Sequence, residues 1–222
     1  VAGKDQVRFQ SLMWQAMLLS AGIKNTDQIF YHGFINSGGQ KMSKSLGNVI
    51  SPYDLVKKYG TDATRYMLLR HINPMEDSDV TWERLDEWYT ANLTNGLGNL
   101  VARVMKLAEE HLPRPVELTD EDEKIKDEFF EKIKAFRFNE AMDIIFQRVA
   151  AADAFMTEHA PYKGIKSDSV SLREAALHDI EHLVRQLASV AAHLVPAMPR
   201  TAVLIASAVR ENRKPDNLFP RL

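Results

Sequence analysis

The chain has 222 residues, and its 28 Lys and Arg residues against 30 Asp and Glu residues give a formal net charge of -2. This balance excludes a globally basic nucleic-acid-binding protein, although it allows a local basic patch. The absence of cysteine excludes a disulfide framework, a thiol nucleophile and a Cys-ligated zinc site within these residues. The sequence contains no apolar run of the about 18 residues that a membrane-spanning helix needs, so we expect no membrane partner.

The first residues indicate a piece of a longer, cytoplasmic protein. They lack an initiating Met and carry charges where a signal peptide has an apolar core. Apolar residues between positions 6 and 20 follow helical spacing, and they predict a buried helix that ends at Ala21-Gly22. Its apolar stripe includes Met13, Trp14 and Met17, which we interpret as core residues.

The next segment has a mixed character. Residues 29–35 (IFYHGFI) predict a strand, and the glycine-containing stretch 36–48 predicts a loop. Ser51-Pro52 supplies an N-cap and a preset first residue for a helix that we expect to end at Gly60. Thr61-Asp62 opens another helix, in which Asp62 is expected to be a first-turn carboxylate.

From about residue 81 the apolar residues follow helical spacing almost throughout. We predict helices at residues 81–111, 119–136, 139–158, 169–194 and 199–211, joined by short loops. This pattern indicates a mainly α fold in which these helices form an antiparallel bundle. The change in composition predicts two domains, residues 1–78 and residues 79–222.

A lysine-rich loop carries the most informative chemistry. Lys41 and Lys44 surround a Met-Ser pair, and Ser45 follows, in a segment that contains Gly38, Gly39 and Gly47. Ammonium groups on flexible stems suit the oxygens of a polyphosphate, and the hydroxyls of Ser43 and Ser45 can add hydrogen bonds. The alternative interpretation is a solvated loop without a ligand.

The string KMSKSLGNVISP resembles the second signature of class I aminoacyl-tRNA synthetases. Its surroundings, from GKDQVRF through FYHGFINSGGQKMSKSLGN, DATRYMLLR and LGNLVAR to LFPRL, are most similar to the methionyl-tRNA synthetase family. The first signature of the class, His-Ile-Gly-His, does not occur. The resemblance therefore implies the C-terminal portion of a synthetase: the end of a Rossmann-type catalytic domain, followed by a helical anticodon-binding domain.

This resemblance implies roles in nucleotide binding. Lys44, assisted by Lys41, would bind the ATP phosphates and stabilise the charge on the departing pyrophosphate, and Mg²⁺ would accompany ATP as a substrate. Gly3 would let the backbone approach the adenosine closely, and the Asp5 carboxylate would accept a hydrogen bond from a ribose hydroxyl. The alternative for Asp5 is a helix N-cap. We expect no protein-bound metal, because the histidines show no zinc-ligand spacing.

The resemblance also implies a methionine pocket. Phe9 and Gln10 align with the end of a string that lines this pocket, although many family members have His where Gln10 stands. Both side chains can donate or accept a hydrogen bond, so the site can survive with altered polarity. The alternative is that Phe9 is a core residue and Gln10 a surface residue.

The helical half has candidates for RNA recognition. Asn99 and Arg103 are four residues apart and share a helix face, and the resemblance places them against the first base of the anticodon of tRNA(Met). Tyr162 stands where many family members have Trp, and it offers a face on which an anticodon base can stack. The alternatives are a helix-surface pair for Asn99 and Arg103, and a packing aromatic for Tyr162.

The expected function is ATP-dependent activation of L-methionine and its transfer to tRNA(Met), with this chain supplying the lysine loop and the tRNA-binding part. We expect the chain alone to be inactive. One alternative is a class I synthetase for valine, leucine, isoleucine or cysteine. The other is a non-catalytic helical tRNA-binding module.

Overall fold

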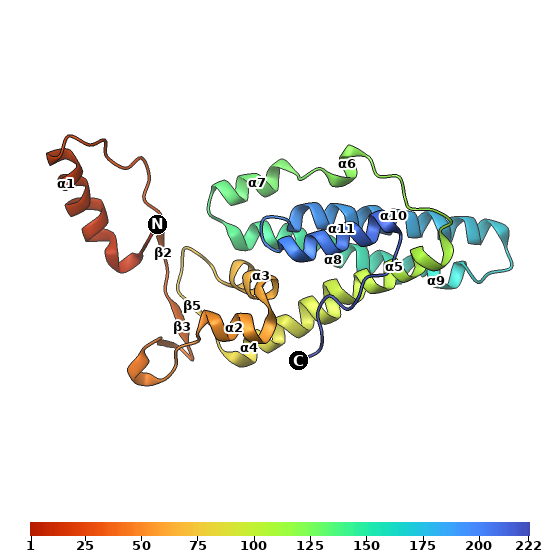
Figure 1. The fold of residues 1–222 in the computed structure, drawn as a ribbon, viewed down its shortest axis with the longest axis horizontal. Coiled ribbons are helices and arrows are strands. Elements are labelled where there is room, and N and C mark those ends of the chain that lie inside the picture. The colour runs from red at the N-terminus through yellow and green to blue at the C-terminus, as the bar shows by residue number, and fades with distance from the viewer.

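The computed structural model describes residues 1–222, except for the side chain of Lys44. The fold is mainly helical, with two small sheets near the amino terminus (Figure 1). Strand β1 (Ala2–Gly3) pairs in parallel with β2 (Tyr31–His32). Strand β3 (Ile35–Ser37) lies between β4 (Gln40–Lys41), which is antiparallel to it, and β5 (Ser78–Asp79), which is parallel.

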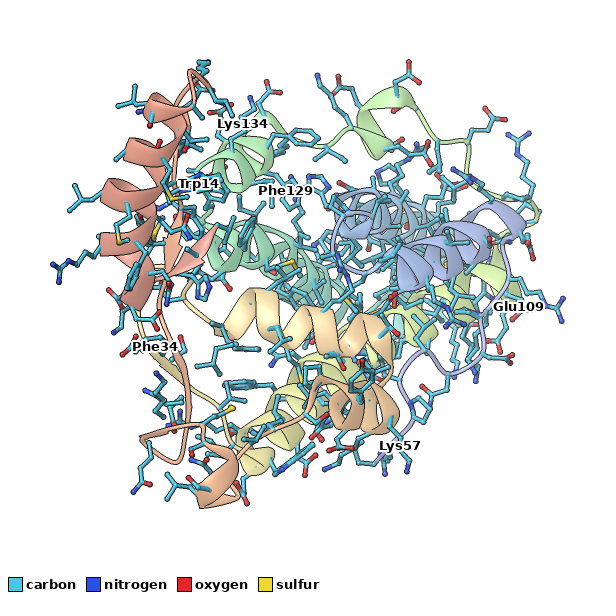
Figure 2. All side chains as sticks on the ribbon, turned by 60° about the vertical axis from the view of Figure 1, so that its left-hand side comes forward. Trp14, Phe34, Lys57, Glu109, Phe129 and Lys134 are labelled. Carbon is cyan, nitrogen blue, oxygen red and sulfur yellow. The ribbon has the colours of Figure 1, made fainter. Side chains whose placement is uncertain are left out.

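The amino-terminal helix forms where the sequence predicts it, but its apolar face is not buried. A 3-10 helix (Lys4–Gln6) leads into a π-helical segment (Phe9–Met13) and then α1 (Trp14–Ser20), which ends at the predicted Ala21-Gly22. Met13, Trp14 and Met17 are 54%, 46% and 61% exposed, so the prediction that they are core residues is wrong. In Figure 2, the helix that carries Trp14 forms one edge of the molecule.

The predicted strand at residues 29–35 is confirmed only in part, because β2 and β3 are interrupted at Gly33. The Gly33 backbone lies so close to the loop before β5 that an added Cβ would be 2.0 Å from the carbonyl oxygen of Glu76. This contact leaves room for glycine alone. The predicted loop at residues 36–48 contains β4 and a 3-10 helix (Lys44–Leu46).

Helices α2 and α3 begin and end as their capping residues predict. Helix α2 (Pro52–Tyr59) starts after Ser51, whose Oγ accepts a hydrogen bond from the backbone N–H of Tyr53 over 3.2 Å. It stops at Gly60, which has a φ of 82°. Helix α3 (Thr61–His71) follows directly.

One long helical rod begins this part of the chain, and the helices that follow it pack mainly against α10 (Val170–Leu194). The rod runs through α4 (Trp82–Trp88), a π-helical segment (Tyr89–Gly98) and α5 (Asn99–His111). The helices that follow it in the chain are α6 (Asp120–Glu123), α7 (Asp127–Lys134), α8 (Phe138–His159), α9 (Pro161–Gly164), α10 (Val170–Leu194) and α11 (Pro199–Glu211). The predicted helices are therefore present, except that the helix predicted at residues 119–136 is broken into α6 and α7.

A contact from a distant helix accompanies that break. The Nε2 atom of His193, on α10, accepts a hydrogen bond from the backbone N–H of Lys126 over 3.2 Å. The Nδ1–H of the same ring donates to the Ser189 carbonyl over 2.7 Å, which defines the neutral tautomer. Burial lowers the pKa of His193 and so favours this neutral form.

The hydrophobic core is continuous from α2 and α3 into the bundle. Tyr66 and Met67 of α3 are fully buried together with residues of α5, α8 and α10. Two further contacts join α3 to α11 and to the segment before it. Oδ2 of Asp62 accepts hydrogen bonds from the N–H and Oγ of Thr201, and Arg65 donates to the carbonyls of Pro196 and Ala197. The proposed boundary at residue 78 stays a prediction.

Candidate functional site

The lysine loop is a hairpin held at both ends. Gly38 and Gly39 both have positive φ, at 63° and 74°, as a two-residue turn between twisted strands requires. The N–H of Gly39 donates to the Asp79 carboxylate over 2.8 Å, which attaches the turn to β5.

Asn48 closes the other end of the loop. Its Oδ1 accepts a hydrogen bond from the backbone N–H of Ser43 over 2.8 Å, and its Nδ2 donates to the Lys41 carbonyl over 3.4 Å. The hydroxyls of Ser43 and Ser45 lie 2.7 Å apart. The side chain of Lys44 lies outside the described part of the chain, so its predicted role stays a prediction.

Two lysines approach the ring of Phe34, which lies between β2 and β3. The Nζ atoms of Lys4 and Lys41 are 4.9 Å and 4.4 Å from the ring centroid, within the range of a cation–π interaction. Lys4 also forms an ion pair with Asp77 at 2.7 Å, and Asp77 accepts the N–H of Phe34 over 2.9 Å. These two hydrogen bonds lower the pKa of the Asp77 carboxyl. Two ammonium groups, of which that of Lys4 is paired with Asp77, therefore meet at the Phe34 ring and form a corner beside β1.

The predicted adenosine turn borders this corner. Gly3 ends β1, and a Cβ added there would be 2.7 Å from Oδ1 of Asp5. Asp5 lies inside the 3-10 helix and Gly3 is its N-cap, so the alternative role of Asp5 as an N-cap is wrong. Among the described residues, no hydrogen bond of the Asp5 carboxylate is found, which leaves its oxygens available.

The methionine-pocket candidates lie on the exposed helix. Phe9 is 50% exposed and Gln10 is partly buried. The alternative interpretation, with Phe9 in the core and Gln10 on the surface, is therefore wrong. The backbone carbonyl of Gln10 accepts a hydrogen bond from Gln15 over 3.0 Å.

A second candidate site lies at the α9 end of α5, far from the lysine loop (Figure 1). A cavity of about 260 Å³, which we call the α5–α9 cavity, is lined by Arg103, Lys106, Leu107, Glu110, His111, Met156, Tyr162, Ile165 and Lys166. Arg103 and Tyr162, predicted from separate parts of the sequence, therefore meet in one cavity. Asn99 does not line it. It lies in a neighbouring hollow of about 320 Å³ with Asn95 and Lys214.

A chain turn before Tyr162 and an ion pair of Arg103 determine the geometry of this cavity. Ala160 takes a left-handed conformation, with a φ of 43°, between α8 and α9, and Pro161 begins α9, so the chain turns sharply just before Tyr162. The guanidinium of Arg103 donates to Asp153 of α8 over 3.0 Å. Tyr162 is 40% exposed, and the Nζ atom of Lys163 lies over its ring, 6.0 Å from the centroid.

Several of these contact residues were not predicted from the sequence. Phe34, Asp77 and Asp153 join the sites through contacts with distant parts of the chain, and no local pattern indicates such contacts. Within the described residues there is no group of three or more His, Asp or Glu side chains placed to hold a metal ion. None of the described helices combines the length and the apolar character needed to cross a bilayer.

Comparison with known proteins defines the class first. Residues 1–105 match the family described as tRNA synthetases class I (M), so this part of the chain is similar to the class I tRNA synthetases. The relatives to which nearly the whole chain is similar are named methionine–tRNA ligases. That of Fusobacterium nucleatum is 34% identical over 97% of this chain, and that of Thermotoga maritima is 32% identical over 96%. The chain spans 35% of the length of each of these relatives.

A solved structure agrees with these relatives. The methionyl-tRNA synthetase of Mycobacterium tuberculosis, bound by methionyl-adenylate, matches all of this chain with a TM-score of 0.81 and 27% identity. The chain covers 48% of that protein. The free form of the same enzyme matches 99% of the chain with a TM-score of 0.78.

Proposed function

We propose that this chain is the C-terminal portion of a cytoplasmic methionyl-tRNA synthetase, in which the lysine loop serves amino-acid activation and the helical bundle binds tRNA(Met). The observation that carries the proposal is the structural match of this whole chain to 48% of a synthetase that holds methionyl-adenylate. Two chemically different sites at opposite ends of the molecule support it (Figure 1). One site offers ammonium groups, as a polyphosphate requires, and the other offers an arginine beside an exposed aromatic ring.

At the first site, the corner formed by Lys4, Lys41 and Phe34 receives the nucleotide. Gly3 and the free carboxylate of Asp5 bind the adenosine, while Lys41 is close enough to Phe34 to be held near that turn. Lys41 and Lys44 then neutralise the ATP phosphates as the methionine carboxylate attacks the α-phosphorus and pyrophosphate leaves. Ser43 and Ser45 offer hydroxyls to the same phosphates. Mg²⁺ arrives as part of the substrate MgATP.

Phe9 and Gln10 line the methionine pocket in this proposal. The exposed large apolar side chains of the amino-terminal helix support the idea that this segment belongs to a larger catalytic domain, since soluble proteins rarely expose such contiguous faces. The same proposal implies that this chain by itself forms no methionyl-adenylate, because the first class I signature is missing from it.

The test of the first site is pyrophosphate exchange in the full-length protein. Replacing Lys44→Ala should slow methionine-dependent exchange by about 10²–10³-fold, the typical effect of removing one charge-stabilising group. Exchange at the normal rate would contradict the assignment. Exchange that depends on valine, leucine, isoleucine or cysteine instead of methionine would favour the first alternative.

At the second site, Arg103 contacts the first anticodon base and Tyr162 stacks on a base. Their convergence on the α5–α9 cavity supports this pairing, and the cavity is slightly smaller than the about 300 Å³ at which drug-sized ligand pockets begin, as suits a single base. Asn99 contacts the neighbouring nucleotide from its own hollow. A purely non-catalytic tRNA-binding module would share this site, but its lysine loop would not bind ATP.

The test of the second site is tRNA binding by the chain itself. Arg103→Ala should weaken binding of tRNA(Met) far more than binding of a tRNA with another anticodon, by about 1–3 kcal/mol of discrimination. Lys134→Ala, on α7, is the control and should change neither affinity. An equal loss for both tRNAs would mean that Arg103 contacts only a phosphate.

A further inference from the structure

The α5–α9 cavity has a basic rim that the proposed base contacts do not use. Lys106 lies one turn after Arg103 on the same face of α5, and Lys166 lies across the cavity, just after α9. Glu110 is the acidic residue among those that line the cavity, all of which the structure describes. The cavity therefore carries a positive charge although the whole chain has a formal net charge of -2.

The ion pairs distinguish these cations from Arg103. The Arg103 guanidinium is 3.0 Å from Asp153, so a carboxylate directly offsets its charge. Lys106 pairs only loosely with Glu110, at 3.8 Å, and 61% of its side chain is exposed. Among the described residues, no carboxylate lies within ion-pair distance of Lys166.

The floor of the cavity is apolar. Met156 is buried and Ile165 is partly buried, so the Tyr162 ring and these side chains offer an apolar surface in a cavity that the two lysines also line. A single-stranded nucleotide combines two matching features: a flat apolar base that can stack, and a phosphate that carries one negative charge.

From this arrangement we propose that Lys106 and Lys166 bind backbone phosphates of the RNA loop whose base enters the α5–α9 cavity. The inference rests on the proposed tRNA-binding function and assigns base contacts and phosphate contacts to different residues of the cavity. Arg103 and Tyr162 contact the base, while Lys106 and Lys166 add affinity that does not depend on the base sequence. Phosphate contacts by Lys displace counterions, so they make binding depend on salt concentration.

The test measures the affinity of the full chain for tRNA(Met) at several NaCl concentrations, with a second tRNA that differs only in its anticodon. Lys106→Ala and Lys166→Ala should each make the slope of log K against log[NaCl] shallower by about 0.7, the value per phosphate on a single strand. Each should weaken both tRNAs by the same factor. Tyr162→Ala should lower affinity and leave the slope unchanged.

Lys134→Ala serves as the matched control. Lys134 is an exposed helical lysine paired with Glu131 at 2.9 Å, and Figure 2 shows it on the opposite side of the molecule from Glu109, the neighbour of the cavity residue Glu110. An unchanged slope in both cavity variants would overturn the inference while leaving the proposed function intact. A wild-type chain that binds both tRNAs equally, or neither, would overturn the proposed function itself.

Discussion

Ala160 holds a backbone conformation that side chains other than glycine rarely adopt. Its φ of 43° and ψ of 53° place it in the left-handed region at the C-terminal end of α8. Replacing Ala160→Gly should remove this strain and raise the free energy of unfolding by about 0.5–1 kcal/mol, because the strain outweighs the added flexibility of the unfolded chain. Denaturant unfolding of both proteins measures the difference. A less stable variant would show that the strain is absent.

His71 makes the stability of the chain depend on pH. Its ring stacks on Trp88 at 4.3 Å, and burial together with the charge of Arg70 lowers its pKa to about 4. Above about pH 6.5 the ring is neutral in both the folded and the unfolded state, so it adds no pH dependence there. As the pH falls from about 6.5 toward 4, His71 binds a proton in the unfolded chain but not in the folded chain. The free energy of unfolding therefore decreases.

The corresponding measurement is denaturant unfolding at pH 7.5 and pH 5.5. The wild-type protein should lose more stability between these values than His71→Gln, whose side chain does not titrate. Equal losses in the two proteins would show that His71 is not the group responsible.

Among the elements, α3 and α11 are joined by Asp62. The sequence predicts Asp62 as a first-turn carboxylate of its own helix. It does lie in the first turn of α3, but it is 8% exposed and its Oδ2 accepts two hydrogen bonds from Thr201, in the first turn of α11. Thus one carboxylate satisfies a free N–H at the start of a helix 139 positions away in the chain.

Replacing Asp62→Ala should lower the free energy of unfolding by about 1–3 kcal/mol, because it leaves a buried N–H and a hydroxyl without their acceptor. Thr201→Val removes only the hydroxyl bond and should cost less. Urea unfolding of the two variants measures both costs, and an Asp62→Ala protein as stable as Thr201→Val would contradict this role of the N–H bond.

The sequence predicts correctly the ends of those helices that are set by capping residues next to them in the chain. Ser51-Pro52 and Gly60 mark the ends of α2 because an N-cap and a left-handed stop act within a few residues. The break between α6 and α7 could not be predicted in this way, since its contact comes from His193 on α10. Gly96 and Gly98 lie within the π-helical segment, where Gly98 packs against Phe219.

At the scale of the whole molecule, burial was the property hardest to predict. The spacing of Met13, Trp14 and Met17 fixes a common helix face, but what covers that face depends on other parts of a protein. The candidate sites show the same limit. The sequence indicates Lys41, Arg103 and Tyr162 individually, whereas the Phe34 ring and the α5–α9 cavity appear only when distant segments are brought together.

The central claim is that the helical half of this chain recognises a tRNA by its anticodon. The most direct measurement is the affinity of the wild-type chain for two tRNA(Met) transcripts that differ only in the first anticodon base, at one fixed salt concentration. We predict a loss of at least about tenfold for the altered transcript, which corresponds to about 1.4 kcal/mol. Equal affinities for the two transcripts would contradict the account.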